Sequence, residues 1–254
     1  MKREYTAEFR FYEELNDFLP PAQRKQALPF SFNGHPGIKD PIEVFGIPHT
    51  EVDLIIVNGT SVGFDYQLQH GDRVAVYPVF ESFDISPLVK LRSSPLRHTA
   101  FIIDVNLGKL ARYLRMLGFD ALYSNRYRDS EVVDIACQQQ RIVLTRDRRL
   151  LFSKRIDHGY WVRSVCPLQQ TDEVLQRFDL YLQIRPFYRC LLCNGLLESV
   201  NKADILKYLE PKTKLYYDKF FRCAKCDRIY WEGSHVENMR KWCQQYMTSP
   251  RSKL

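Results

Sequence analysis

Two short apolar runs in this sequence each end at an aspartate, and segments with helical periodicity lie between them. Residues 100–103 precede Asp104, and residues 141–146 precede Asp147. Runs of this length, bounded by polar residues, are typical of strands that are buried on both faces of a sheet. Ligands bind outside the carboxyl ends of the strands in an open parallel sheet, so we expect both aspartates at the functional edge of one sheet.

The segments around these runs predict an α/β fold with a parallel sheet. A helix is expected after Asp104, where Leu107, Leu110, Leu114 and Leu117 would form one apolar face. Further along the chain we expect a strand at residues 120–124, a helix from residue 129 or 130, a strand at 160–165 and a helix at 171–182. Strands that alternate with helices favour parallel pairing through right-handed crossovers.

Residues 1–85 predict a separate α+β domain of the β-grasp type. Strands are expected at residues 7–12, 53–59 and 70–78, with a short helix at 41–46. Residues 86–98 contain two prolines and little pattern, so we expect a linker there.

The charge balance changes at the same point in the chain. The first 85 residues hold 7 Lys/Arg and 13 Asp/Glu, and the rest of the chain holds 30 and 17, a net charge of +13. A basic part of this kind favours nucleic acid as a partner, with a solvated basic surface as the alternative. No apolar run approaches the roughly 18 residues of a membrane span. The first residues lack the apolar segment of a signal peptide, so we expect a cytoplasmic protein with no membrane association.

A metal site is predicted by Cys190, Cys193, Cys223 and Cys226, which form two C-x₂-C pairs separated by 29 residues. Four thiolates are the ligand set of a closed structural zinc site, and in a reducing compartment paired motifs favour a metal over disulfides. Redox-active or incidental cysteines are the alternative. Asn194-Gly195 and Asp227-Arg228 predict chain reversals after each pair, and the long gap predicts an inserted helix near residues 203–209.

Two further acids lie where a helix is expected to follow a strand. Asp129 and Glu131 would therefore reach the same sheet edge as Asp104 and Asp147. Carboxylates from separate elements suit a hard divalent cation, Mg²⁺ or Mn²⁺, which can activate water for phosphodiester hydrolysis. A helix N-cap explains Asp129 equally well, and Glu131 can simply complement the helix dipole.

Together these stretches resemble the Mut-seven C-terminal ribonuclease domain, a member of the PIN-like nuclease fold. Residues 101–118 are similar to the opening of that domain, and residues 144–151 to its second acidic motif. Its appended zinc ribbon is matched by residues 189–195, 221–226 and 230–235. The first part of the chain resembles the ubiquitin-like β-grasp domain that is often fused to it.

The resemblance implies an α/β PIN-like parallel sheet with a C-terminal zinc ribbon, preceded by an α+β ubiquitin-like domain. The expected organisation is a ubiquitin-like domain at 1–85, a linker at 86–98, a nuclease domain at 99–184, a zinc ribbon at 185–245 and a tail at 246–254. The N-terminal domain also resembles small sulfur-carrier proteins but lacks their Gly-Gly end, so we expect it to bind a protein partner of unknown identity or to present a substrate.

The implied activity is that of a metal-dependent ribonuclease acting on RNA. Asp104 and Asp147 would bind Mg²⁺ or Mn²⁺, and the pair Asp129 and Glu131 would supply the third acidic position of the catalytic site. The family's class usually has a fourth acid just past the second acidic strand, where this chain has residues 148–151 (Arg-Arg-Leu-Leu); Asp157 lies further along. This departure leaves a single-metal site, or a non-catalytic RNA-binding or adaptor protein, as alternatives. Phosphate contacts are expected from Lys109, Arg112, Arg115, Arg146, Arg148 and Arg149.

Overall fold

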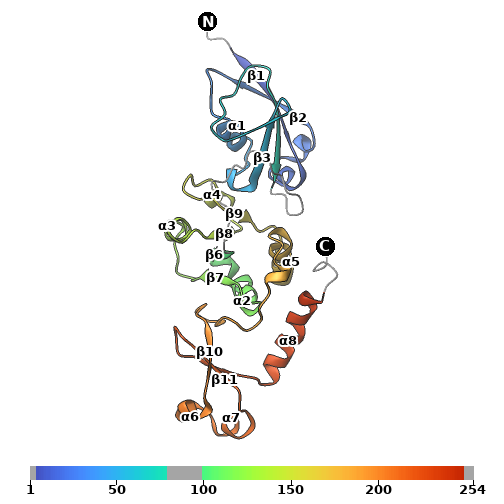
Figure 1. The fold of residues 1–254 in the computed structure, drawn as a ribbon. Helices are drawn as coiled ribbons and strands as arrows, with labels where there is room; N and C mark the ends of the chain where they lie inside the picture. The colour runs from blue at the N-terminus through green and yellow to red at the C-terminus, as the bar shows by residue number, and fades with distance from the viewer. Residues whose placement is uncertain (1–3, 79–98, 249–254) are drawn as a thin grey trace. The chain divides into compact units, whose positions relative to one another are not determined.

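The computed structural model describes residues 4–78 and 99–248, and its internal contacts divide the chain into two compact units (Figure 1). One unit holds residues 1–98 with 136–161, and the other holds 99–135 with 162–254. The expected linker at 86–98 lies outside the described residues, as does the end of the expected tail. No helix in the described part of the chain is long and apolar enough to span a membrane.

The N-terminal domain is built on a five-stranded sheet in the order β2-β1-β5-β3-β4. The central strands β1 and β5 are parallel, and the other pairs are antiparallel, as in a β-grasp domain. Alternate residues of β1 are buried because successive side chains of a strand point to opposite faces. The elements are β1 (Tyr5–Phe11), β2 (Ala27–Phe32), α1 (Lys39–Val44), β3 (Val52–Val57), β4 (Thr60–Val62) and β5 (Arg73–Pro78), with 3₁₀ turns at Glu13–Phe18, Pro21–Gln23 and His49–Glu51.

A four-stranded sheet in the order β7-β6-β8-β9 follows. The pairs β6–β7 and β8–β9 are parallel, which confirms the expected parallel sheet. All four residues of β8 are buried, as the apolar run before Asp147 predicts. The strands are β6 (Ala100–Ile103), β7 (Asp120–Tyr123), β8 (Ile142–Thr145) and β9 (Gly159–Trp161).

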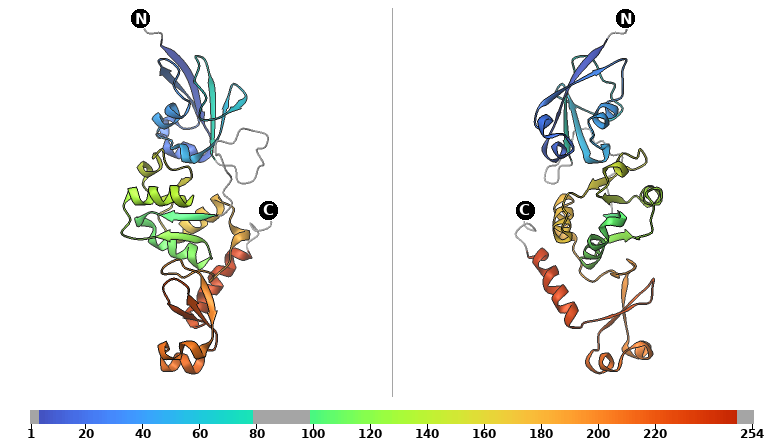
Figure 2. Two further views of the ribbon diagram at one scale, coloured as in Figure 1. Left: turned by 60° about the vertical axis from the view of Figure 1, so that its left-hand side comes forward. Right: turned by 180° about the vertical axis from the view of Figure 1, so that it is seen from behind.

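Helices surround this sheet (Figure 2). The predicted leucine face of α2 is at most 1% exposed at Leu107, Leu110, Leu114 and Leu117. The strand expected at 160–165 is only three residues long. Helix α5 starts earlier than expected because Pro167 fits the first helical turn, and it ends at Arg177. The helical elements are a 3₁₀ turn at Val105–Leu107, α2 (Gly108–Met116), α3 (Asp129–Gln139), α4 (Arg148–Leu151), α5 (Pro167–Arg177) and a 3₁₀ turn at Tyr181–Gln183.

The C-terminal region, here called the cysteine ribbon (residues 188–233), contains a three-stranded antiparallel sheet. The insertion predicted near residues 203–209 is helical, and Ile205 and Leu209 bury themselves against Phe220 of the sheet. A final helix packs back on α2, with the rings of Trp242 and Tyr113 5.1 Å apart. The elements are β10 (Leu197–Val200), α6 (Lys202–Ile205), a 3₁₀ turn at Leu206–Tyr208, α7 (Pro211–Tyr216), β11 (Phe220–Cys223), β12 (Ile229–Trp231) and α8 (Ser234–Met247).

The N-terminal domain makes specific polar contacts with residues 136–161, which belong to the same compact unit. The buried carboxylate of Glu51 accepts a 2.6 Å hydrogen bond from the backbone N–H of Trp161. The ring of His49 lies between two acceptors, the Glu43 carboxylate at 2.8 Å and the Ile156 carbonyl at 3.0 Å. A neutral imidazole donates through only one nitrogen, so a proton on the second nitrogen would complete both contacts at the cost of a buried charge.

Acidification is expected to destabilise this unit through His49. Burial, followed by the charge of Lys39, lowers the pKa of His49 below its usual value despite the hydrogen bond to Glu43. Between that lowered pKa and the unfolded value near 6.5, the unfolded chain binds the proton more readily, so stability falls as the pH falls through this window. Urea unfolding at pH 7.5 and 5.5 measures the loss.

His49→Gln should lose less stability on acidification than the wild type, because the residue no longer titrates. His70→Gln is the matched control, since His70 is an exposed histidine of the same domain. Equal losses in the wild type and in His49→Gln would contradict this assignment.

Candidate functional site

The sulfur atoms of Cys190, Cys193, Cys223 and Cys226 all lie within 4.8 Å of one another. Among the described residues, this is the one group of three or more His, Cys, Asp and Glu side chains whose ligand atoms lie close enough together to hold a metal ion. The sulfurs of Cys190 and Cys226 are 3.7 Å apart, and those of Cys193 and Cys223 are 3.3 Å apart. Sulfurs about 2.3 Å from a central zinc ion in a tetrahedron would be separated by about 3.8 Å, so the group can bind such a metal.

The backbone after each cysteine pair folds into the reversal that the sequence predicts. Asn194 and Asp227 both have positive φ values, 68° and 59°, which Asn and Asp tolerate better than most residues. The amide of Cys193 points at the Cys190 sulfur, and the amide of Lys225 points at the Cys223 sulfur. These donors stabilise negative charge on the sulfurs.

The four thiols are crowded enough to affect one another. Burial raises the pKa of Cys193 to about 12, and hydrogen bonding with the other three sulfurs adds to the rise. Burial also opposes ionisation of Cys190, but the hydroxyl of Tyr230 and two backbone amides lower its pKa to about 6. Four sulfurs in so small a space therefore carry full thiolate charge only beside a cation.

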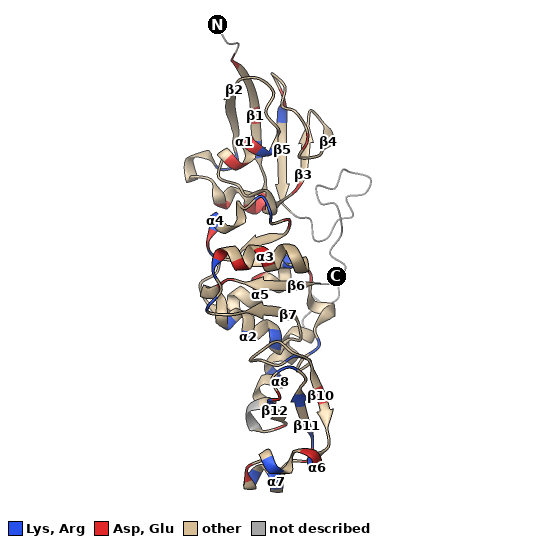
Figure 3. Cartoon of the chain, turned by 90° about the vertical axis from the view of Figure 1, so that its left-hand side faces the viewer, with Lys and Arg blue, Asp and Glu red and all other residues tan. Residues whose placement is uncertain are grey.

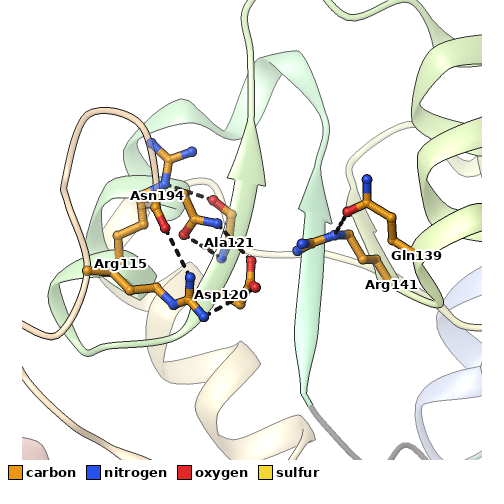
Figure 4. A network of polar contacts seen from close by, with 7 residues as sticks. Arg115, Asp120, Ala121, Gln139, Arg141 and Asn194 are labelled. Atoms are coloured by element: carbon orange, nitrogen blue, oxygen red, sulfur yellow. Dashed lines mark hydrogen bonds and ion pairs between the residues drawn. The ribbon is translucent and has the colours of Figure 1, made fainter. Parts of the chain in front are cut away.

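The first cysteine pair is joined to the edge of the parallel sheet by side chains that bind the backbone of Ala121 (Figure 4). The Asn194 side-chain oxygen accepts from the Ala121 N–H at 3.0 Å, and its amide nitrogen donates to the Asp120 carboxylate at 2.7 Å. Arg115 donates to the Ala121 carbonyl at 2.8 Å and to the carbonyls of Leu191 and Leu192. We call this group of contacts the edge clamp.

The clamp corrects the role expected of Arg115. The sequence places it on the polar side of its helix as a phosphate contact, but it is 4% exposed and donates its hydrogen bonds to the backbone carbonyls described above. Burial lowers the pKa of the guanidinium, while the nearby Cys190 and Cys193 sulfurs act in the opposite direction. The residue thus binds the ribbon, and it is not available to RNA.

Asp104 directly follows β6 and is 4% exposed. One of its oxygens accepts from the N–H of Val105 at 2.6 Å, which starts the 3₁₀ turn that leads into α2. The neighbouring parallel strand β7 is connected to this turn at its carboxyl end, where the Tyr123 hydroxyl donates to the Val105 carbonyl at 3.1 Å. A side chain at Gly108 would collide with that hydroxyl, its Cβ falling 2.6 Å from the oxygen, so glycine permits this contact.

Asp129 and Glu131 are exposed in the first turn of α3, the helix that follows β7. Glu131 reaches back to accept from the backbone N–H of Arg128 at 2.8 Å, as the acid of a capping box does. Both acids also complement the positive end of the helix dipole. The local contacts of Glu131 therefore agree with the structural alternative that the sequence left open, and a metal-binding role remains a proposal.

Asp147 follows β8 and is exposed. Its carboxylate accepts from the N–H of Arg149 at 2.8 Å, and its own N–H donates to the hydroxyl of Thr145. Arg148 is half-buried, with its guanidinium carbon 3.7 Å from the ring centroid of Trp161 and 5.1 Å from that of Phe18. These cation–π contacts fix the chain just after the acid, so we assign Arg148 to packing.

Four of the expected phosphate contacts are exposed in the structure: Lys109, Arg112, Arg146 and Arg149. Further lysine and arginine residues, outside the expected set, lie on α7 and on β11 of the cysteine ribbon (Figure 3). The sequence around Asn194 predicts only a chain reversal and gives no indication that this side chain binds a distant strand. Asn194 is 7% exposed in the structure, and the sequence alone does not show that this polar residue is buried.

The fold and the sites together define a protein in which a β-grasp domain precedes an α/β domain with acids at its strand ends and a four-cysteine ribbon. The chain matches the Mut7-C RNAse domain over residues 99–243 and the Mut7-C ubiquitin domain over residues 4–84. It belongs to the Mut7-C RNAse domain family, with the two domains in the expected order. No curated protein and no solved structure matches the chain.

The edge clamp is expected to stabilise the fold. Asn194→Gly keeps the positive φ value but removes the acceptor of the Ala121 N–H and one donor to the Asp120 carboxylate, which keeps its ion pair with Arg189. An unsatisfied buried donor costs about 1–3 kcal/mol, so the free energy of unfolding should fall by about that amount. Asp227→Gly is the matched control, because it makes the same change at the equivalent exposed position of the second pair. Equal destabilisation of the two variants in urea unfolding would argue against the clamp.

Proposed function

We propose that the chain is a metal-dependent ribonuclease whose catalytic acids are Asp104, Asp129, Glu131 and Asp147. The observation that carries the proposal is the position of these acids in a member of the Mut7-C RNAse domain family. Asp104 and Asp147 follow parallel strands, and the other two begin a helix that follows the neighbouring strand β7. The carboxyl ends of parallel strands are where such folds bind ligands.

The donor chemistry fits Mg²⁺ or Mn²⁺, since carboxylate oxygens are the ligands that these cations prefer. Asp104 and Asp147 would hold the ion, which when bound supplies water activation and charge stabilisation at phosphorus. One oxygen of each aspartate is fixed by a backbone N–H, which orients the carboxylate before any ligand arrives. This preorganisation supports a binding role for both residues.

The exposed residues Lys109, Arg112, Arg146 and Arg149 would contact RNA phosphates and position the strand. The short helix α4, residues 148–151, holds no carboxylate, so it cannot supply the acid that the resemblance places just past the second acidic strand. Its two leucines are buried. This favours a site with fewer metal ligands, and it is also the observation behind the second candidate function, a non-catalytic RNA-binding or adaptor protein.

Replacing the strand-end aspartates should abolish cleavage while the protein stays folded. Asp104→Asn and Asp147→Asn each keep an oxygen that can accept the local backbone hydrogen bond but remove the negative charge that a cation needs. Cleavage of an end-labelled single-stranded RNA, with Mg²⁺ or Mn²⁺ added back to dialysed protein, should slow by roughly 100-fold or more.

Glu8→Gln is the matched control for charge removal, because Glu8 is exposed on a strand of the N-terminal domain. Wild-type cleavage by Asp104→Asn would rule out the proposed site. RNA binding without cleavage by the wild type, at any concentration of either cation, would favour the adaptor function.

The four cysteines, we further propose, hold a structural zinc ion and so make the region a zinc ribbon. The sulfur separations and the crowding of the four thiols support this assignment. Closed sites with four cysteine ligands are structural, since no position is left for water or substrate. The ion would hold the first cysteine pair in the shape that carries Asn194 to the sheet edge.

Purified protein should contain one zinc ion per chain, and removing it should lower the midpoint of thermal unfolding. Cobalt substitution gives a second readout, since sulfur ligands produce charge-transfer absorption that carboxylates do not. Cys193→Ser should lose the metal, whereas Cys166→Ser, at an exposed cysteine outside the group, should keep it. Full zinc content in Cys193→Ser would contradict the assignment.

A further inference from the structure

The small sheet of the cysteine ribbon has two faces with different chemistry. In the register of β11 and β12, Phe221 lies opposite Tyr230, and Arg222 lies opposite Ile229. Residues that face each other across antiparallel strands share one side of the sheet, and neighbours along a strand alternate. Cys223 and Tyr230 therefore lie on the metal side, and Arg222 and Ile229 lie on the other.

The second face carries a groove of about 470 Å³. The helical insertion forms one wall, with Tyr208 and Glu210, and strands β11 and β12 with the loop between them form the other. Both views of Figure 2 show the insertion, in orange, at one end of the three-stranded sheet. The insertion is held there by the small core around Phe220, so the two walls are fixed relative to each other.

Two large aromatic rings line this groove and remain accessible. Trp231 is 37% exposed and Tyr208 is 59% exposed, although Ile205 and Leu209 beside them are buried. The ammonium group of Lys207 lies 4.9 Å from the ring centroid of Tyr208. Exposed rings at the rim of a groove offer flat surfaces on which a planar ligand can stack.

Charged groups beside the rings complete a site for a base and its backbone. Arg222 and Asp227, both exposed, form an ion pair at 2.7 Å inside the groove, and Glu210 lies on the other wall. Residues 201–231 hold 8 Lys/Arg against 4 Asp/Glu, so the surroundings are positive even though the groove itself contains acids. Carboxylates accept from the amino groups of bases, and surrounding cations attract phosphates.

We propose that this groove binds one unpaired base of single-stranded RNA, stacked on Trp231 and Tyr208. RNA as the ligand rests on the proposed function. A base within a duplex is stacked on its neighbours and cannot enter, whereas proteins that read single strands splay bases onto aromatic rings. The groove lies on the side of the ribbon away from the cysteines and would hold the strand at a point outside the catalytic acids.

Binding is measured with the zinc-loaded full chain and a 2-aminopurine-labelled single-stranded oligoribonucleotide, in buffer without Mg²⁺ or Mn²⁺. The wild type should quench the 2-aminopurine fluorescence, since quenching reports stacking. Trp231→Ala and Tyr208→Ala should each weaken binding roughly 5- to 100-fold, as expected when one base loses its aromatic platform. Blunt duplex RNA should compete poorly.

Tyr216→Ala is the matched control, because Tyr216 is 70% exposed in the same insertion but does not line the groove. Trp231→Phe and Tyr208→Phe keep a ring and should retain most of the affinity. Equal affinity of Trp231→Ala, Tyr208→Ala and Tyr216→Ala would overturn the proposal.

A measurement on the unmodified protein covers the case in which an alanine variant fails to fold. Light-induced crosslinking of a 5-iodouridine oligonucleotide should attach it to peptides containing Tyr208 or Trp231, and crosslinks confined to other peptides would overturn the proposal. The two proposals can be tested separately. If the protein binds and crosslinks RNA in this way but never cleaves it, only the catalytic proposal is contradicted. If the protein cleaves RNA and the groove variants bind RNA as tightly as the wild type does, only the groove proposal is contradicted.

Discussion

The four-stranded sheet depends on the groups that cover the backbone of its outer strands. In the order β7-β6-β8-β9 the first and last strands each have one side that no strand of the described residues pairs with. Such a side exposes N–H and C=O groups that must find other partners or water. At β7 the N–H and the C=O of Ala121 are bound by the side chains of Asn194 and Arg115, so side chains complete what a fifth strand would supply.

A related arrangement is found at β9, where the N-terminal domain supplies the acceptor. The Glu51 carboxylate binds the N–H of Trp161, and the indole ring of that residue packs against the core of the N-terminal domain. Glu51 and Asn194 come from the two regions added to the α/β domain, and each binds an outer strand through a side-chain oxygen. The N-terminal domain and the cysteine ribbon thus act as structural parts of the sheet. This explains why each of these two regions belongs to a compact unit that also contains strands of the sheet.

Much of this fold follows from local sequence, and the exceptions have physical causes. The buried runs before Asp104 and Asp147, the leucine face of α2 and the reversals at Asn194 and Asp227 are local patterns, and all are confirmed. A β-grasp unit predicts a second early strand, but no local pattern locates β2, which contains Pro29 and so lacks one N–H; as an outer strand of its sheet, it tolerates this loss. β4 is three residues long, too short for a pattern to appear.

The site was less predictable, because a residue's role there depends on partners far away in sequence. Arg115 looks like a surface cation by residue type, yet its carbonyl partners Leu191 and Leu192 lie more than 70 positions further on. Arg148 likewise finds Trp161 and Phe18 through tertiary packing. Counting cations near an acidic motif therefore overstates the number that can reach RNA, since Arg115 and Arg148 are held by structural partners.

The cysteine ribbon shows how one small sheet can support two separate roles. Because side chains alternate between the faces of a strand, Cys223 and Arg222 are neighbours in sequence but point to opposite sides. The cysteine side leads to the pair that reaches the edge of β7, and the other side carries the aromatic groove. Changes to groove residues leave the cysteines and the clamp in place. Loss of a bound metal would instead disturb both sides, since β11, which lines the groove, ends at Cys223.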